Sequence, residues 1–288
     1  ESLADGIAED LITALSRIRW LFVIARTSAF AFKGGTPDVR QVGAALGVRY
    51  VVEGSVRKSV DRIRVSAQLI DATTGHHVWA QKYDRELVDI FDLQDEISET
   101  IAAAIEPEIG EVERERARRK PPGSLDAWAC YQRGLWHIYR FVKGDNAKAQ
   151  DLLCRAVELD PNFAAAFAAL GYSHFLDITL AFTKSRSESA ALSLRHAGKA
   201  VDLDDKDATA HHALGRALYV MGDGTASIAE LRKAIALNPS FALAHFGLGM
   251  TLSNLAEDPE QALEAYRMAA RLSPHDPAVA LSEHESSL

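Results

Sequence analysis

The chain has 288 residues, enough for two ordinary domains that each bury a core. It is 48% hydrophobic and 25% charged, which is typical of a soluble globular protein. The net charge is −8, and neither half is basic: residues 1–123 hold 17 basic and 20 acidic side chains, and residues 124–288 hold 15 and 20. This balance argues against nucleic-acid binding, because nonspecific attraction to phosphates needs a basic surface.

The two cysteines, Cys130 and Cys154, are too few for a disulfide framework or a four-cysteine zinc site. No apolar run approaches the ~18 residues of a membrane span, and no signal peptide opens the chain. We therefore expect a cytoplasmic location and no membrane contact, with a periplasmic location as the alternative if a longer parent protein has an upstream span. The opening ESLADGIAEDL lacks an initiator methionine, which indicates a fragment of a longer protein.

The first predicted helix covers residues 5–20, where apolar side chains recur at helical spacing. LFVIART (21–27) predicts a short buried strand, and PDVRQVGAALG (37–47) predicts a second helix that ends at a glycine. Together with the strands expected after residue 48, this strand predicts a small mixed sheet with helices on one face.

Residues 49–84 alternate in polarity and predict a three-strand meander with turns at Asp61-Arg62 and Thr74-Gly75. The apolar face would hold Tyr50, Val52, Gly54, Val56, Ile63, Val65, Ala67 and Leu69. The polar face would hold Glu53, Ser55, Arg57, Arg64, Ser66 and Gln68. EGSVRKS (53–59) therefore lies on a strand, whereas a phosphate-binding loop needs a helix start. Arg57 and Arg64 remain a candidate anion site.

A helix beginning near Ile90 carries one apolar stripe, made of Leu93, Ile97, Ile101, Ile105 and Ile109. Pro107 should kink this helix or begin a new segment. EVERERARRK (111–120) predicts a solvated helix with the ion pairs Glu111–Arg114, Glu113–Arg116 and Glu115–Arg119. KPPGS (120–124) would end it and act as a hinge between domains.

The second half of the chain repeats a pair of helices. Pro161, Asp205, Pro239 and Pro274 occupy equivalent positions, in steps of 44 (161 to 205), 34 (205 to 239) and 35 (239 to 274) residues. Small residues recur where paired helices would cross: Gly134, Gly171, Gly215 and Gly249 in the first helices, and Ala156, Ala200, Ala234 and Ala269 in the second. This half resembles the tetratricopeptide-repeat family, with about four repeats. Extra residues around LDITLAFTKSRSES would lengthen a helix or form a loop.

Stacked repeats form a solenoid whose concave face is built mainly from first helices. The inward-pointing candidates for a peptide- or protein-binding groove are Tyr131, Tyr172, His212, Arg216, Tyr219, Phe246 and Asn254. Each ring could instead pack between repeats, and both alternatives stay open. His174, His212 and His245 lie on successive first helices, but no acidic partner at metal-site spacing accompanies them, so we expect no metal site.

The N-terminal segments ADGIAEDLITALSRIRWLFVIARTSAF, VGAALGVRYVVEGSVRK, RIRVSAQLIDATTGHHVWAQKYDREL and IFDLQDEISETI resemble the TolB-type amino-terminal domain of large bacterial signalling proteins. In that family the domain precedes tetratricopeptide repeats. The resemblance implies an upstream class III adenylate or guanylate cyclase domain, or an upstream winged-helix DNA-binding domain. It also implies that the family's first strand is missing here, which would leave a sheet edge unfilled.

The fold class expected is therefore a small α/β domain followed by an all-α tetratricopeptide-repeat solenoid. The expected domains are residues 1–106, a helical linker and hinge at 107–124, and repeats at 125–288. No catalytic residues, metal site or cofactor are predicted. The expected function is that of a non-catalytic regulatory and protein-interaction region, in which movement at the hinge reaches an upstream effector. The alternatives are the regulatory part of a cyclase and the sensor part of a winged-helix regulator; the sequence does not indicate the oligomeric state.

Overall fold

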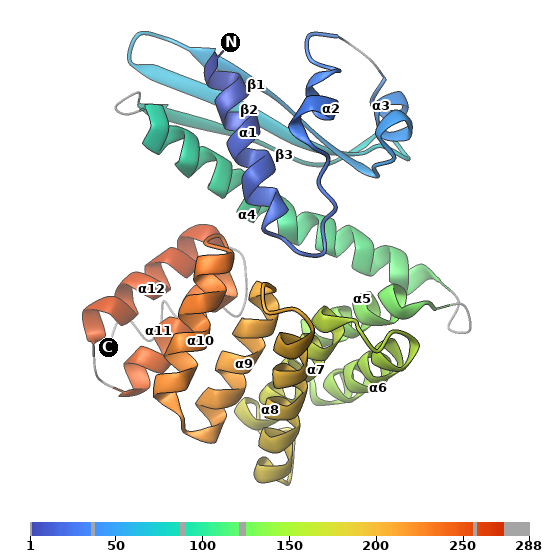
Figure 1. The fold of residues 1–288 in the computed structure, drawn as a ribbon, viewed down its shortest axis with the longest axis vertical. Helices are drawn as coiled ribbons and strands as arrows, with labels where there is room; N and C mark the ends of the chain where they lie inside the picture. The colour runs from blue at the N-terminus through green and yellow to red at the C-terminus, as the bar shows by residue number, and fades with distance from the viewer. Residues whose placement is uncertain (1, 36–37, 87–89, 121–124, 256–257, 274–288) are drawn as a thin grey trace. The chain divides into compact units, whose positions relative to one another are not determined.

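The structure is a computed structural model that describes residues 2–35, 38–86, 90–120, 125–255 and 258–273. It divides into two compact units, Glu1–Ile109 and Gly110–Leu288, shown in Figure 1. The boundary falls inside one long helix, so we describe each unit separately. The predicted linker at 107–124 stays a prediction, since its residues 121–124 lie outside the described part.

The first unit contains a three-stranded antiparallel sheet in the order β1-β2-β3, together with four helices. Its elements are α1 (Ser2–Ser16), α2 (Arg26–Phe30), α3 (Val39–Leu46), β1 (Tyr50–Lys58), β2 (Arg62–Asp71), β3 (His76–Glu86) and the first part of α4 (Ile90–Arg119). The short turns match the predicted meander, and Gly75 has the positive φ of 77° that its turn requires. Among the described strands, β1 and β3 each pair only with β2.

The strand register confirms the predicted faces. Val52 lies opposite Leu69, Gly54 opposite Ala67, and Val56 opposite Val65. Their shared face contributes Ile63, Val65, Ala67 and Leu69 to the core, all 6% exposed or less. Because side chains alternate along a strand, Arg57 and Arg64 lie opposite each other on the other, polar face.

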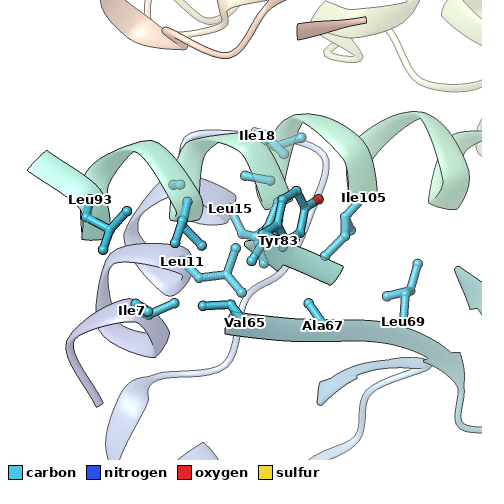
Figure 2. Packing of buried hydrophobic residues seen from close by; sticks show 14 of the residues in the cluster. Ile7, Leu11, Leu15, Ile18, Val65, Ala67, Leu69, Tyr83, Leu93 and Ile105 are labelled. Carbon is cyan, nitrogen blue, oxygen red and sulfur yellow. The ribbon is translucent and has the colours of Figure 1, made fainter. Parts of the chain in front are cut away.

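Helices α1 and α4 cover one face of this sheet (Figure 1). Figure 2 shows Ile7, Leu11 and Leu15 of α1 near Leu93 of α4 and Val65 of β2, and the Tyr83 ring of β3 lies between α4 and β2. The predicted α4 stripe is buried along its length: Leu93, Ile97, Ile101, Ile105 and Ile109 are at most 6% exposed. The hydroxyl of Ser98 also donates to the Ile7 carbonyl at 3.2 Å, which ties the two helices together.

The strand predicted at residues 21–27 is wrong. Residues 21–25 form no helix or strand, and α2 begins at Arg26. Phe22 is 85% exposed, so the apolar run is not buried as the prediction required. A strand needs a neighbour to satisfy its backbone N–H and C=O groups, and the register of β1 to β3 includes no pairing with this segment. The described sheet is therefore antiparallel rather than mixed.

The helix α4 continues through Pro107 to Arg119, so no new segment begins at the proline. The three predicted ion pairs form, with N–O distances of 3.0, 3.1 and 3.0 Å for Glu111–Arg114, Glu113–Arg116 and Glu115–Arg119. Residues 111–119 of α4 are less exposed to solvent than predicted, because Glu113 and Ala117 are buried. Glu113 accepts a hydrogen bond from the Trp128 indole at 3.2 Å, which joins this part of α4 to the first repeat.

The second unit is a helical solenoid of the tetratricopeptide type, and its described residues form four helix pairs (Figure 1). The pairs are α5 (Ala127–Ile138) with α6 (Lys143–Leu159), α7 (Ala164–Thr179) with α8 (Arg186–Leu203), α9 (Ala208–Met221) with α10 (Gly224–Leu237), and α11 (Ala242–Leu255) with α12 (Pro259–Leu272). The predicted insertion lengthens α7 and α8 to 16 and 18 residues, against 14 each in the next pair. Pro274, the last of the predicted equivalent positions, lies outside the described residues.

Glycines at the helix crossings let the backbones approach closely. A Cβ added at Gly134, Gly171, Gly215 or Gly249 would lie 2.8, 2.9, 2.7 or 2.9 Å from an atom of the paired helix. Real Cβ atoms do not come so close to other heavy atoms, so these positions require glycine. The partner alanines Ala156, Ala200, Ala234 and Ala269 are all fully buried. The predicted crossings are confirmed.

Candidate partner-binding site

Three first helices, α7, α9 and α11, bring aromatic and polar side chains into one continuous set around Arg216. We call this set the arginine cluster; it consists of Tyr172, Phe175, His212, Arg216, Tyr219, Met250 and Asn254. Within each helix the members are three or four residues apart, so they share one helical face. The fold therefore places one row of side chains across three neighbouring repeats.

Ring contacts and hydrogen bonds connect the cluster from helix to helix. The rings of Tyr172 and His212 lie 5.5 Å apart, which links α7 to α9. The amide of Asn254 donates to the Tyr219 hydroxyl at 2.6 Å, which links α9 to α11. Asn254 is exposed, while Tyr172 and Tyr219 are half-buried, so this end of the cluster reaches the surface.

Arg216 lies at the centre and is only 4% exposed. Its guanidinium carbon sits 4.3 Å from the Phe175 ring centre and 5.6 Å from the Tyr219 ring centre. Its Nη2 donates to the Met250 sulfur at 3.7 Å, and its Nη1 is buried with no hydrogen-bond partner. Burial lowers the pKa of the Arg216 guanidinium, although an arginine remains charged at neutral pH.

His212 is also buried and packs between two rings. Its imidazole lies 5.2 Å from the Phe241 ring, on the side of the next repeat, as well as against Tyr172. Burial, with a smaller contribution from the nearby charge of Arg216, lowers the pKa of His212 to about 3. His212 is therefore neutral at physiological pH, and Arg216 is the charged group of the cluster.

Two other predicted groove residues lie against rings that are not part of the arginine cluster. Tyr131 is buried, with its ring 5.0 Å from Phe163 and 5.5 Å from Trp128. Phe246 lies 5.8 Å from the Tyr266 ring of α12 and is half-buried. For Tyr131 the structure favours the alternative in which the ring packs in the core.

The cluster contains two residues that were not among the predicted groove residues, Phe175 and Met250. Both carried a usable signal in the sequence. Phe175 follows Tyr172 by three residues, and Met250 lies midway between Phe246 and Asn254, so helical spacing places each on a face already singled out.

The histidines on successive first helices do not converge. His174 lies beside Asp177 and Gln150, with Nδ1 3.6 Å from the Asp177 carboxylate, and stacks on His196 at 5.6 Å. His245 Nε2 lies 2.9 Å from the Pro239 carbonyl, away from both His174 and His212. Within the part of the chain that the structure describes, no group of three or more His, Cys, Asp or Glu side chains is placed to hold a metal ion.

The polar sheet face of the first unit holds the candidate anion site. Arg57 and Arg64 are cross-strand neighbours, but Arg64 forms two hydrogen bonds with Asp84 of β3, at 2.7 and 3.1 Å. These bonds raise the pKa of Arg64 and lower that of Asp84. The charge of Arg64 is thus already balanced, and an anion site there stays a prediction.

Crossing a bilayer requires a helix that is both long and apolar. Among the described ranges, no helix combines the two properties to the degree required.

A family model described as tetratricopeptide repeat matches residues 212–277. A protein of Rhizobium meliloti (strain 1021) named "Putative adenylate cyclase 3" is 42% identical over 218 residues, which is 76% of this chain. The chain spans 37% of that relative's length.

Two solved structures are also similar to the chain. A thermophilic tetratricopeptide-repeat protein of Thermus thermophilus matches 68% of this chain and 92% of its own, with 16% identity and a TM-score of 0.47. PilF of Pseudomonas aeruginosa matches 58% of this chain and 66% of its own, with 26% identity and a TM-score of 0.41.

Proposed function

We propose that this chain is a protein-interaction region of a bacterial signalling protein, and that its repeats bind an extended peptide segment of a partner. The observation that carries the proposal is the arginine cluster. It aligns aromatic and hydrogen-bonding side chains across α7, α9 and α11, the helices that form the concave face of a repeat solenoid. Aromatic and arginine side chains contribute most of the binding energy at protein interfaces.

A peptide-display selection against the full chain tests this proposal. Selected peptides would be synthesised with a fluorescent label, and their affinity measured by fluorescence anisotropy. Asn254→Ala removes an exposed member of the cluster and should weaken binding severalfold. Glu264→Ala, at an exposed position of the neighbouring helix α12, is the matched control and should leave the affinity unchanged.

The proposal fails if no selected peptide binds, or if Asn254→Ala and Glu264→Ala behave alike. Circular dichroism of both variants checks that the helices are intact. Asn254 is exposed, so a loss of binding in that variant would not reflect a loss of core packing.

We also propose that the chain is the non-catalytic part of a nucleotidyl cyclase, with its first unit a TolB-type domain. The identity to the Rhizobium meliloti relative supports this context over the winged-helix alternative. The meander covered on one face by α1 and α4 supports the assignment of the first unit. Because the chain spans 37% of the relative's length, the catalytic residues would lie in a different part of the parent protein.

Two measurements test the cyclase context. The chain alone, incubated with ATP or GTP and a divalent metal, should form no cyclic nucleotide above a blank without protein; turnover by the chain would contradict the proposal. Reading the gene upstream of the codon for Glu1 should show a domain with paired metal-binding aspartates. A winged helix with a basic recognition helix there would support the alternative instead.

A further inference from the structure

Arg216 carries a buried positive charge that nothing in its described surroundings neutralises. It forms no ion pair with any carboxylate of the described residues, and its Nη1 is less than 1 Å² exposed with no acceptor. Buried charges in proteins are almost always paired, because removing an unpaired charge from water is strongly unfavourable. An uncompensated guanidinium in the middle of the proposed binding face therefore calls for an explanation.

The side chains around Arg216 compensate this cost only in part. Contacts with the faces of Phe175 and Tyr219 stabilise the charge through the electron-rich ring faces. A ring face does not replace a hydrogen-bond acceptor, and a buried N–H without an acceptor is destabilising. The bond from Nη2 goes to a thioether sulfur, which is among the weakest acceptors in proteins.

We propose that Arg216 is the anchor for a carboxylate of the bound peptide. The proposal rests on the repeats being a peptide-binding surface, and it names the chemistry of the partner. A guanidinium presents two parallel N–H donors, and a carboxylate presents two oxygens at the matching separation. One oxygen would accept from Nη1, and the other would replace the Met250 sulfur at Nη2.

Met250 is placed to act as the movable cover of this site. It is half-buried on α11, and its side chain has three rotatable bonds, so it can leave Arg216 without moving a helix. The rings that remain, Tyr172, Phe175 and Tyr219, would then surround the ion pair and favour an aromatic or aliphatic residue next to the acid. The net charge of −8 gives acidic segments no general attraction to the chain, so the local charge of Arg216 would have to supply the recognition.

The experiment uses the full chain and the peptides selected by display. Each is compared with two neutral forms, one with Asp and Glu replaced by Asn and Gln, and one with an amidated C-terminus. We expect one of these changes to weaken binding by tenfold or more, and which one it is identifies a side-chain or a C-terminal carboxylate. Arg216→Met should abolish that difference, so that acidic and neutral peptides bind the variant equally weakly. Arg216→Lys keeps the charge without the paired donors and should fall between.

Stability without peptide gives a second readout. Arg216→Met removes an unpaired buried charge and keeps an apolar side chain of similar length, so it should raise Tm by about 2–4 °C or more. A lower Tm would show that the rings and Met250 already satisfy the guanidinium, which would overturn the proposal.

The outcomes separate this inference from the proposed function. Peptides that depend on Asn254 but bind equally well without their carboxylates, and equally well to Arg216→Met, would overturn the inference and leave the binding function standing. A selection that yields no binder, or binders insensitive to Asn254, would overturn both.

Discussion

Gly171 of α7 and Ala197 of α8 are in backbone contact: a Cβ added at Gly171 would lie 2.9 Å from the Ala197 nitrogen. Backbone atoms cannot move aside as the end of a flexible side chain can. The crossing of these two helices therefore depends on the missing side chain at position 171.

Gly171→Ala should destabilise the repeats. The added methyl group forces α7 and α8 apart, and overpacking of this kind typically costs about 1–3 kcal/mol. The neighbouring Gly198→Ala is a matched control, because a Cβ there meets nothing within 4 Å. Replacing a helical glycine by alanine should stabilise by up to about 1 kcal/mol. Urea denaturation followed by circular dichroism should thus show shifts of opposite sign, and equal shifts would contradict the role given to Gly171.

Glu113 should matter more to stability than Glu111, although each pairs with an arginine three residues later. The Glu113 side chain is 7% exposed and accepts from both Arg116 and the Trp128 indole. The Glu111 side chain is 63% exposed, although its partner Arg114 is only 13% exposed. Glu113→Ala should lower the free energy of unfolding by about 1–3 kcal/mol, because it leaves the half-buried Trp128 indole and the Arg116 guanidinium without that acceptor.

Glu111→Ala should cost less than about 1 kcal/mol, because the carboxylate that it removes is mostly exposed and its charge is screened by solvent. Both variants would be measured in the same urea titration. A cost for Glu113→Ala no larger than that for Glu111→Ala would show that the buried contact between α4 and the first repeat adds little.

Stability should fall as the pH drops below the ordinary histidine range. The pKa of His212 is lowered to about 3 in the folded chain, and that of His196 to about 4, in both cases chiefly by burial. A depressed histidine pKa means that the unfolded chain binds the proton more readily. The neutral histidines therefore stabilise fully above about pH 6.5, and this contribution is lost between there and about pH 4 for His196 and about pH 3 for His212.

His212→Phe should flatten this pH dependence, since the variant keeps a ring against Tyr172 and Phe241 but has no proton to bind. The measurement is the urea midpoint of both proteins at intervals from pH 7.5 to about 4. Parallel curves for the two would rule out His212 as a source of the acid sensitivity.

The polar sheet face can be tested with inorganic phosphate. Asp84 occupies two donors of Arg64, so Asp84→Asn should free this guanidinium beside Arg57. We expect the Asn variant to gain more Tm from added phosphate than the wild type, and a further Arg57→Ala change to remove the gain. Sodium chloride at matched ionic strength is the control. An identical change in Tm of all three proteins on adding phosphate would show that Arg57 and Arg64 do not form an anion site.

The sequence was most informative where side chains recur at a fixed spacing. The apolar stripe of α4, the alternation of β1 and β2, and the glycines at the helix crossings each follow from a local pattern, and all are confirmed. Residues 21–27 have the composition of a buried strand, but a strand also needs a pairing partner, which composition does not reveal. Helical spacing places Phe175 and Met250 on the groove faces, but it does not show that they contact Arg216, because they come from repeats on either side of it.

The four helix crossings carry a consequence for how this chain tolerates change. In each pair the two helices approach closely because one carries a glycine and the other a buried alanine at the crossing. A deep mutational scan of the second unit should therefore show sharp minima in tolerance that recur with the period of the repeats. The interval between the glycine minima would widen to 44 residues where α7 and α8 are extended, from Gly171 to Gly215, and return to 34 from Gly215 to Gly249.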